Sequence, residues 1–218
     1  MVNVQRVSEI DPARFVYSLP RVNQSGGQTI FVNLPDHFSK KVVIALPRCP
    51  LPFGLSDYKG RKSLQFSLPD SDERIEEFRA FLTKLDLQNV QTAVNNSTKW
   101  FKKSLPANAV QELYNPSMKQ NSDKYPPIFR ARFPTHPDTG NFVGDIFDKN
   151  KNVVGVGAIT PGCQVEAIVE LVGLYFVAKE FGTSWKVVQL KVYPTERIRG
   201  YAFLCDSDSE DLSDAEPN

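Results

Sequence analysis

The sequence predicts a mostly β fold of the α+β class, in which a helical segment interrupts the strands. Fifteen Phe and an apolar content of 41% in 218 residues supply a core rich in aromatic rings. Sixteen Pro and twelve Gly indicate many turns and short elements. Alternating apolar residues recur along the chain, whereas helical spacing occupies about 70–115 only. We therefore expect one domain over residues 1–205, with a helical insert at about 70–115.

Three strands are expected before the insert. The segments "QTIFVNL" (28–34) and "KVVIALP" (41–47) flank a turn, and "SLQFSL" (63–68) alternates in polarity. The Pro-rich stretch 47–54 reads as a loop that ends the second strand. The basic run "YKGRK" (58–62) is placed in the loop between the second and third strands.

The insert has the spacing of helices. Ile75, Phe78 and Leu82 fall on one face, and a polar residue among 70–72 can cap the first helix. A second helix is expected to continue past Leu87 and to end before Pro106. The segment 107–114 predicts a third, short helix.

The β pattern returns after the insert. Strands are expected at 128–133 and 142–148, with a shorter one at 153–156, followed by an apolar hairpin at 169–194 and a segment at 195–204. Three strands, a helix and further strands is the order of an oligonucleotide-binding (OB) barrel. The sequence therefore predicts an OB-like β-barrel with an enlarged helical insertion between strands three and four.

The charge is unevenly distributed. The last thirteen residues carry six carboxylates and no base; removing them turns 26 basic and 25 acidic residues into 26 and 19, an excess of seven positive charges. A basic body with an acidic tail is a reason to consider nucleic acid as a partner. We expect residues 206–218 to be a disordered regulatory tail. Its carboxylates are Asp206, Asp208, Glu210, Asp211, Asp214 and Glu216.

The remaining composition points to an intracellular protein that is not an enzyme. The three cysteines lie far apart and form neither a disulfide framework nor a zinc motif, which fits a reducing compartment. The N-terminus has no apolar signal core, and no apolar run could span a membrane. No nucleophile motif or phosphate-binding loop is present, so we expect no catalytic residue, cofactor or metal.

The hairpin suggests a binding face. Simple alternation over 185–193 puts Val188, Leu190 and Val192 on a core face, with Lys186 at its edge. It puts Trp185, Lys191 and Tyr193 on the other face, and Tyr175 lies on the partner strand. Aromatic rings that stack on bases beside lysines that meet phosphates suit single-stranded nucleic acid. The alternative is that Trp185 and Tyr193 pack under the helical insert.

A second basic stripe lies on the strand "IFRARF". Alternation puts Arg130 and Arg132 on one face and the Phe and Ala residues on the other. Two arginines side by side on one strand face are not both core residues. They either contact phosphates or form a solvated face with acidic partners.

Residues 115–203 also carry a resemblance. The stretch "GLYF" at 173–176, followed by "SWKVVQLKV" at 184–192, resembles a family of single-stranded-DNA-binding proteins from large nucleo-cytoplasmic DNA viruses. The resemblance implies an OB-type core with an acidic tail. It also implies replication or recombination work in the cytoplasm, viral factory or nucleus of an infected cell. Of the binding residues, it carries over Tyr175, Trp185, Lys186 and Lys191.

Two hypotheses follow. In the first, the chain binds single-stranded DNA without sequence preference through the seven residues named above, and the tail regulates binding or recruits replication proteins. In the second, it is a structural or interaction protein of the virion or the replication complex, whose aromatic residues are core and whose basic face binds protein. Oligomeric state and the choice between DNA and RNA are left open.

Overall fold

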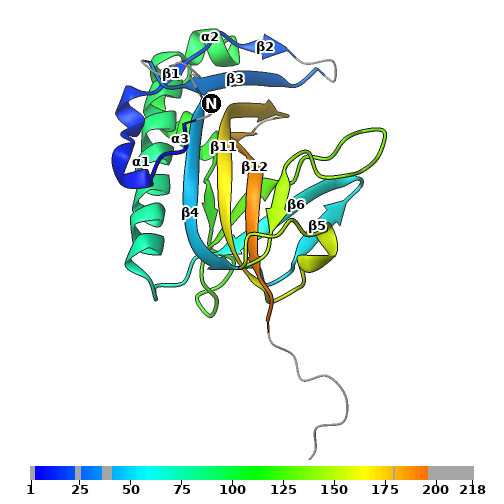
Figure 1. Ribbon diagram of the computed structural model, residues 1–218. Helices are drawn as coiled ribbons and strands as arrows, with labels where there is room; N and C mark the ends of the chain where they lie inside the picture. The colour runs from blue at the N-terminus through cyan, green and yellow to red at the C-terminus, as the bar shows by residue number, and fades with distance from the viewer. Residues whose placement is uncertain (1–2, 23–25, 36–40, 179, 196–218) are drawn as a thin grey trace, which may run out of the picture.

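The computed structural model is a mostly β protein in which a long helix lies against a strongly bent sheet (Figure 1). It describes residues 3–22, 26–35, 41–178 and 180–195. The predicted acidic tail, and all but the first residue of the segment 195–204, lie outside these ranges. Within them, no helix is long and apolar enough to cross a membrane.

The elements follow the predicted order, with several short strands added. The strands are β1 (Val16–Tyr17), β2 (Arg21–Val22), β3 (Gln28–Asn33), β4 (Val42–Pro50), β5 (Leu55–Tyr58), β6 (Arg61–Ser67), β7 (Tyr114–Asn115), β8 (Met118–Lys119), β9 (Ile128–Arg132), β10 (Asp145–Phe147), β11 (Gln164–Val177) and β12 (Glu180–Tyr193). The helices are α1 (Glu73–Asn95), α2 (Ser97–Phe101) and α3 (Ala107–Leu113), with 3-10 turns η1 (Val7–Glu9), η2 (Pro12–Arg14) and η3 (Val156–Ala158).

Helix α1 forms where the spacing predicts it. The Asp72 side chain accepts a hydrogen bond from the Arg74 backbone N–H and so caps the first turn. The predicted apolar face is buried, and the ring of Phe78 meets the ring of Phe129 edge-on at 5.1 Å. One difference is that α1 continues unbroken to Asn95, beyond the predicted start of a second helix, because its buried face continues through Asn89 and Ala93.

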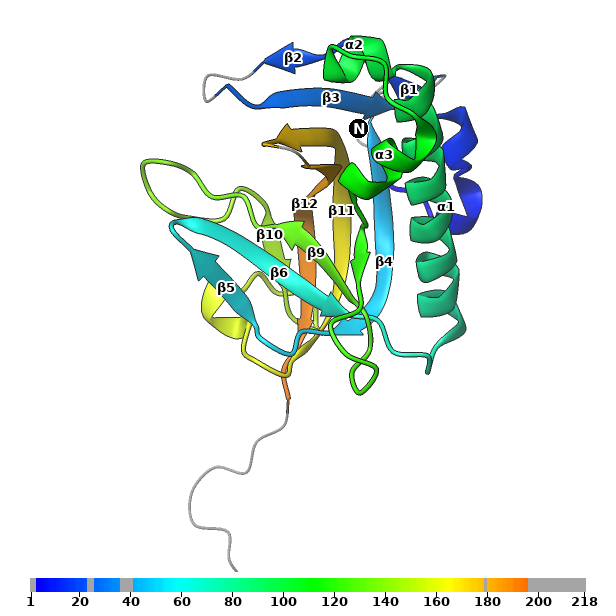
Figure 2. The same cartoon turned by 180° about the vertical axis from the view of Figure 1, so that it is seen from behind.

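The β11–β12 hairpin organises the sheet. The first half of β11 pairs with β4, and after a register shift between Leu171 and Gly173 its second half pairs with β3. Strand β12 pairs in parallel with β10, β9 and β7, and β9 leads on to β6 and β5. Seen from behind, the β5–β6 hairpin and β9 cross over the long hairpin and wrap the core (Figure 2). Strands β4 and β6, which are not paired in the sheet, also lie close together.

A β-bulge in β12 overturns part of the predicted face assignment. Val187 pairs with Val169 and Gln189 pairs with Ile168, so Val188 has no partner in the ladder. The extra residue reverses the inward and outward directions of residues 185–187 relative to those of residues 190–192. Trp185 and Val187 therefore point into the core with Leu190 and Val192, whereas Lys186 joins the outer face that carries Lys191.

Two segments predicted as loops are partly strand. Strand β4 runs to Pro50 through the Pro-rich stretch, and a register shift opposite Val165–Ala167 accommodates Pro47 there. The run 58–62 spans a tight turn that joins β5 to β6. The segment 153–156 forms only an isolated bridge, between Val153 and Phe147, and not the expected strand.

Candidate nucleic-acid interface

A polar hollow with a volume of about 460 Å³ lies between β6, β9, β12 and the segment that carries β7 and β8. We call it the basic groove, because all of the charged side chains that line it among the described residues are cationic. They are Arg61, Lys62, Lys119, Arg130 and Arg132. Such a lining favours an anion.

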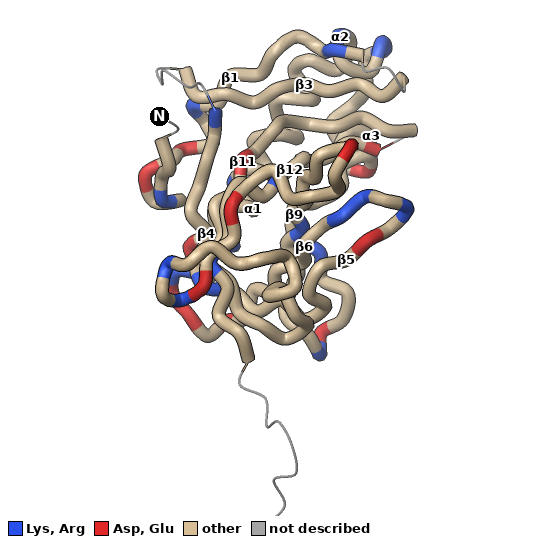
Figure 3. Tube along the Cα trace, turned by 45° about the vertical axis from the view of Figure 1, so that its right-hand side comes forward, with Lys and Arg blue, Asp and Glu red and all other residues tan. Residues whose placement is uncertain are grey.

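Strand register aligns the cations of β6 and β9. Ser63 is the Cα partner of Arg132, and Gln65 is the partner of Arg130. Because paired residues point to the same side of a sheet, Ser63, Gln65 and both arginines share the outer face. The Arg130 Nε donates a hydrogen bond of 3.0 Å to the Ser63 Oγ. Basic positions follow the β5–β6 hairpin and β9 in Figure 3. The predicted alternation of this strand is confirmed, since Ala131 and both flanking phenylalanines are buried.

The opposite wall is polar and braced by hydrogen bonds. The Asn115 Nδ2 donates to the Tyr175 Oη at 2.9 Å, and this fixes the half-buried Tyr175 ring in the wall. The Ser117 and Thr183 hydroxyls lie 2.8 Å apart and share a hydrogen bond. These side chains can donate to and accept from base edges, sugars and phosphate oxygens.

A buried carboxylate on α1 anchors this wall. Asp86 accepts hydrogen bonds of 2.6 Å from the Tyr114 Oη and the Ser117 Oγ, and one of 3.0 Å from the Ser117 backbone N–H. Burial raises the pKa of Asp86, and the hydrogen bonds from Ser117 and Tyr114 offset this only in part. The Asn89 Nδ2 donates to the same Tyr114 Oη, so the helix holds the groove wall through a connected network.

Trp185 is buried, whereas the sequence prediction puts its ring on an exposed face. It borders the groove, but only 3% of the residue is exposed, and its ring meets the core ring of Phe129 at 5.5 Å. Phe129 in turn meets Phe78 of α1, so the Trp185 ring is linked to the helical insert through Phe129. Its Nε1–H has no hydrogen-bond partner among the described residues.

Lys186 lies beside the groove and is already paired. Its Cα pairs with that of Arg132, which puts it next to the cation row. Its Nζ lies 3.2 Å from a carboxylate oxygen of Glu170, and the Lys41 Nζ lies 3.3 Å from the same oxygen. Because the Glu170 carboxylate already pairs with Lys186, this lysine attracts a phosphate less strongly than the arginines of β9 do.

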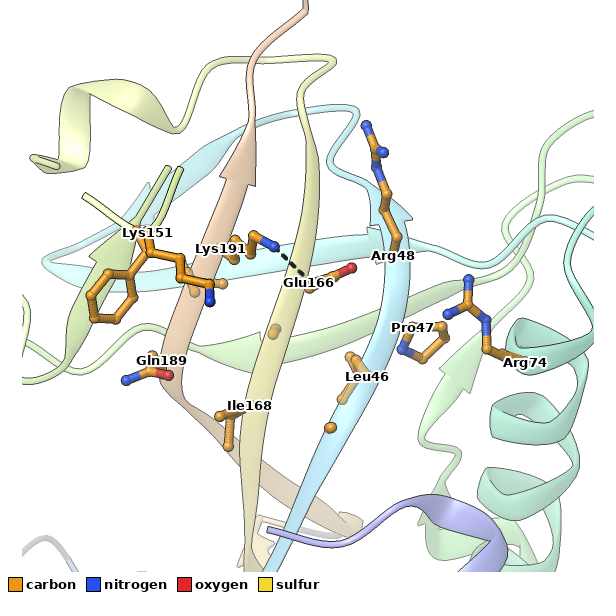
Figure 4. Close-up of a pocket in the computed structure, with 13 residues that line it drawn as sticks. Leu46, Pro47, Arg48, Arg74, Lys151, Glu166, Ile168, Gln189 and Lys191 are labelled. Carbon is orange, nitrogen blue, oxygen red and sulfur yellow. Dashed lines mark ion pairs between the residues drawn. The ribbon is translucent and has the colours of Figure 1, made fainter. Parts of the chain in front are cut away.

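Lys191 and Tyr193 belong to a different surface. Lys191 lines a second hollow of about 490 Å³ on the outer face of β4, β11 and β12, where it reaches toward Glu166 at 3.9 Å (Figure 4). The Arg48 guanidinium covers the Tyr193 ring at 3.9 Å from its centroid. A hydrogen bond with Tyr193 raises the pKa of Lys191, with a smaller contribution from Glu166, so this lysine is cationic at neutral pH.

The structure therefore divides the seven predicted residues. It brings Arg130, Arg132 and Tyr175 together in the basic groove, puts Lys186 beside it and Lys191 and Tyr193 elsewhere, and buries Trp185. The seven predicted residues omit three cations of the groove: Arg61 and Lys62, which belong to the basic run 58–62 noted in the sequence, and Lys119. The polar alternation of Arg61, Ser63 and Gln65 was visible as a signal, whereas Lys119 is brought in only by the pairing of β8 with β9.

No metal centre is found among the described residues. Among them, no group of three or more His, Cys, Asp or Glu side chains is arranged to hold a metal ion. Cys49 and Cys163 are both buried, and burial raises the pKa of each thiol.

Comparison with known proteins identifies the fold. Residues 61–204 match the "Family of unknown function (DUF5871)". No curated protein matches the sequence. The crystal structure of gp2.5, a single-stranded DNA binding protein encoded by bacteriophage T7, is similar with a TM-score of 0.50 and 15% identity. The match covers 74% of this chain and 91% of gp2.5. At this identity the likeness concerns the fold alone, and it confirms the predicted OB-like barrel with a helical insertion.

Weaker similarities extend to a second phage protein. The single-stranded DNA-binding protein from bacteriophage Enc34 is 12% identical, with a TM-score of 0.40 over 88% of this chain and 93% of that one. Its complex with single-stranded DNA gives 0.39 at the same identity, over 84% and 94%.

Proposed function

The chain belongs to the family of unknown function DUF5871, and we propose that it is a single-stranded DNA-binding protein that holds the strand in the basic groove. The observation that carries the proposal is the groove itself: five cationic side chains line it without one carboxylate among the described residues. The fold supports the same conclusion, since gp2.5 of phage T7, which shares it, binds single-stranded DNA.

The contacts favour binding without sequence preference. Arg and Lys side chains meet phosphates, which position a strand but carry no sequence information. Counterions released from those phosphates make the affinity fall steeply with salt. The half-buried Tyr175 offers a ring in the wall of the groove, and stacking on a ring tolerates any base. The chain then acts as a binding protein and not as an enzyme.

We propose a role in viral DNA replication or recombination, on the strength of the resemblance carried by 173–176 and 184–192 to proteins of large nucleo-cytoplasmic DNA viruses. Such a protein would work in the reducing interior of an infected cell. The carboxylates of 206–218 would compete with DNA for the cations or recruit a replication protein. Phosphorylation of Ser207 or Ser213, each of which has an acid three residues later, would strengthen either effect.

A second function is favoured by one observation. The burial of Trp185 removes one of the three aromatic residues that pointed to stacked bases, as expected if the aromatics are core residues. In that case the basic groove would bind an acidic protein segment in a virion or replication complex.

The test is a comparison of single and double strands. Fluorescence anisotropy of a labelled oligo-dT and of a duplex of the same length would be measured with the full-length protein at about 50 mM and about 200 mM salt. We expect tighter binding of oligo-dT, with a marked loss at the higher salt. Equal affinity for both would overturn the preference for the single strand. No binding of oligo-dT at low salt would overturn the proposal in favour of the protein partner.

A further inference from the structure

The rings that line the basic groove offer little surface to a base, since Trp185 is buried and Tyr175 is half-buried. A more exposed ring next to the groove would add base stacking to the phosphate contacts. One ring, Tyr58, lies at the end of the same sheet face.

Strand register puts Tyr58 on the face of the groove. Its Cα pairs with that of Arg61, two residues before Ser63, which in turn pairs with Arg132. Since paired residues share a face and the pattern repeats every two residues, Tyr58 and Arg61 lie on the outer face with Arg132. Tyr58 therefore extends the cation row of β6 and β9 by one position.

The Tyr58 ring is available and its backbone is held in place. The residue is 65% exposed, so its ring contributes little to the core. The Lys59–Gly60 turn, in which both residues have positive φ, closes the hairpin, and the Asp57 carboxylate accepts a hydrogen bond from the Gly60 N–H at 2.9 Å. Strand β5 ends the sheet path, and no other described strand pairs along its free edge. A ring on a stable hairpin loses little freedom when it stacks.

Two cationic side chains lie close to the ring. The Lys59 Nζ lies 5.4 Å from the centroid of the ring, and Arg61 stands directly across the hairpin. A base stacked on Tyr58 would thus have its flanking phosphates next to cationic side chains. Alternating ring and cation is the arrangement by which sequence-tolerant sites hold a single strand.

We propose that Tyr58 is a base-stacking platform at the end of the basic groove, and that the β5–β6 hairpin supplies the aromatic contact that Trp185 does not. This inference rests on the proposed function, because it names a contact of the same site. It also extends the binding surface beyond the lining of the groove to the tip of the hairpin.

The experiment separates stacking from charge. Full-length wild type and Tyr58→Ala would be titrated with oligo-dT and with an abasic deoxyribose-phosphate oligomer of the same length. Tyr58→Phe keeps the ring. Phe53→Ala is the matched control, because Phe53 is an aromatic residue of similar exposure, 59%, that does not line the groove.

We expect Tyr58→Ala to weaken oligo-dT binding by about 5-fold to about 100-fold, and to leave binding of the abasic oligomer unchanged. Tyr58→Phe and Phe53→Ala should bind oligo-dT as wild type does. If Tyr58→Ala binds oligo-dT like wild type, or loses both oligomers equally, Tyr58 is no stacking platform while the proposed function stands. If wild type itself does not bind oligo-dT, the proposed function fails and this inference falls with it.

Discussion

Arg130 and Arg132 differ from the lysines of β12 in what surrounds them. Both arginines are exposed, and neither has an ion pair with a described residue, whereas Lys186 and Lys191 face Glu170 and Glu166. Exposed ion pairs stabilise a fold only slightly, but they compete with an incoming phosphate. The arginines also present a planar fork that suits phosphate oxygens. We therefore assign the main phosphate contacts to β9.

Replacing both arginines should weaken DNA binding in a salt-dependent way. We expect Arg130→Ala with Arg132→Ala to cost about 1–2 kcal/mol of binding free energy per residue and to reduce the slope of log K against log salt by about 2. The measurement is the affinity for oligo-dT over a series of salt concentrations. Lys84→Ala is the control, because Lys84 pairs with Asp11 on the outside of α1 and should leave the slope unchanged. A double variant with the wild-type slope would show that the strand binds elsewhere.

For single residues, the sequence predicted the direction of a side chain correctly where the strand alternates regularly, and wrongly where a bulge interrupts the alternation. The strand at 128–133 has no bulge, so the outward direction of both arginines was predictable. In β12 one unpaired residue, Val188, separates Trp185 from Lys191, and no residue type near it announces a bulge. The direction of Trp185 could not be derived without the partner strand.

The elements of the fold hold the groove through two local arrangements. One is the bulge in β12, where the loop before β10 presses against the strand. A Cβ atom on Gly144 would lie 2.0 Å from the Val188 carbonyl oxygen, so only glycine fits there. The loop at Gly144 therefore packs closely against the bulged residue of β12.

Gly144→Ala should destabilise the protein. The backbone at Val188 must move to admit the methyl group, and overpacking of this kind costs about 1–3 kcal/mol or more. Urea denaturation would measure the loss. The control is Gly157→Ala, because no atom lies within 4 Å of a Cβ at Gly157 and the change should stay within about 0.5 kcal/mol. Equal stability of the two variants would refute the close approach.

The second arrangement is the hydrogen-bond network of Asp86, which makes the free energy of unfolding depend on pH. Burial raises the folded-state pKa of Asp86 above that of the unfolded chain, so the folded state binds this proton more tightly. The contribution of Asp86 to stability is therefore largest below the unfolded pKa and is lost as the pH rises through the folded pKa. Asp86→Asn does not titrate. The free energy of unfolding of the variant should therefore increase relative to that of wild type as the pH rises from the unfolded-state pKa of Asp86 to its folded-state pKa.

Denaturation of both proteins at a series of pH values would measure this difference. Asp72→Asn is a control of opposite sign. Hydrogen bonds from Arg74 lower the pKa of Asp72, so wild type should lose its advantage over this variant as the pH falls through the folded pKa. A pH-independent difference between wild type and Asp86→Asn would contradict the account of the buried carboxylate.

Local sequence patterns predicted some helices and strands of the fold but not others. The helical insert was predictable, because a cap at Asp72 and one apolar face are both local signals. The strand at 63–68 was predicted and corresponds to β6, whereas its hairpin partner β5 was missed because prolines and a basic turn flank it. The pairing of β9 with β6 on one edge and of Lys186 with Arg132 on the other is long-range, and it alone assembles the groove.

The whole molecule combines a basic groove with an acidic C-terminal sequence. The excess of seven positive charges over residues 1–205 becomes an excess of one in the full chain. Charges of opposite sign attract over roughly 10 Å at moderate ionic strength, so the C-terminal carboxylates and a DNA strand would compete for the same cations. This distribution was visible in the sequence, whereas the place where the positive charge gathers was not.

Removing the C-terminal carboxylates should strengthen binding. We expect the chain ending at Cys205 to bind oligo-dT more tightly than the full chain at low salt, and the difference to shrink as salt rises. Replacing the six carboxylates by their amides is the matched control, because it keeps the length of the segment and removes only its charge. Unchanged affinity in both would exclude electrostatic competition.

The most direct test of the central claim is to locate the bound strand. A bromodeoxyuridine oligomer would be photo-crosslinked to the full-length protein, and the attached peptides would be identified by mass spectrometry. The basic groove predicts crosslinks within 55–67 and 114–132. Crosslinks confined to 41–50 and 189–195, around the second hollow, would place DNA on the outer face of β4, β11 and β12 and contradict the account.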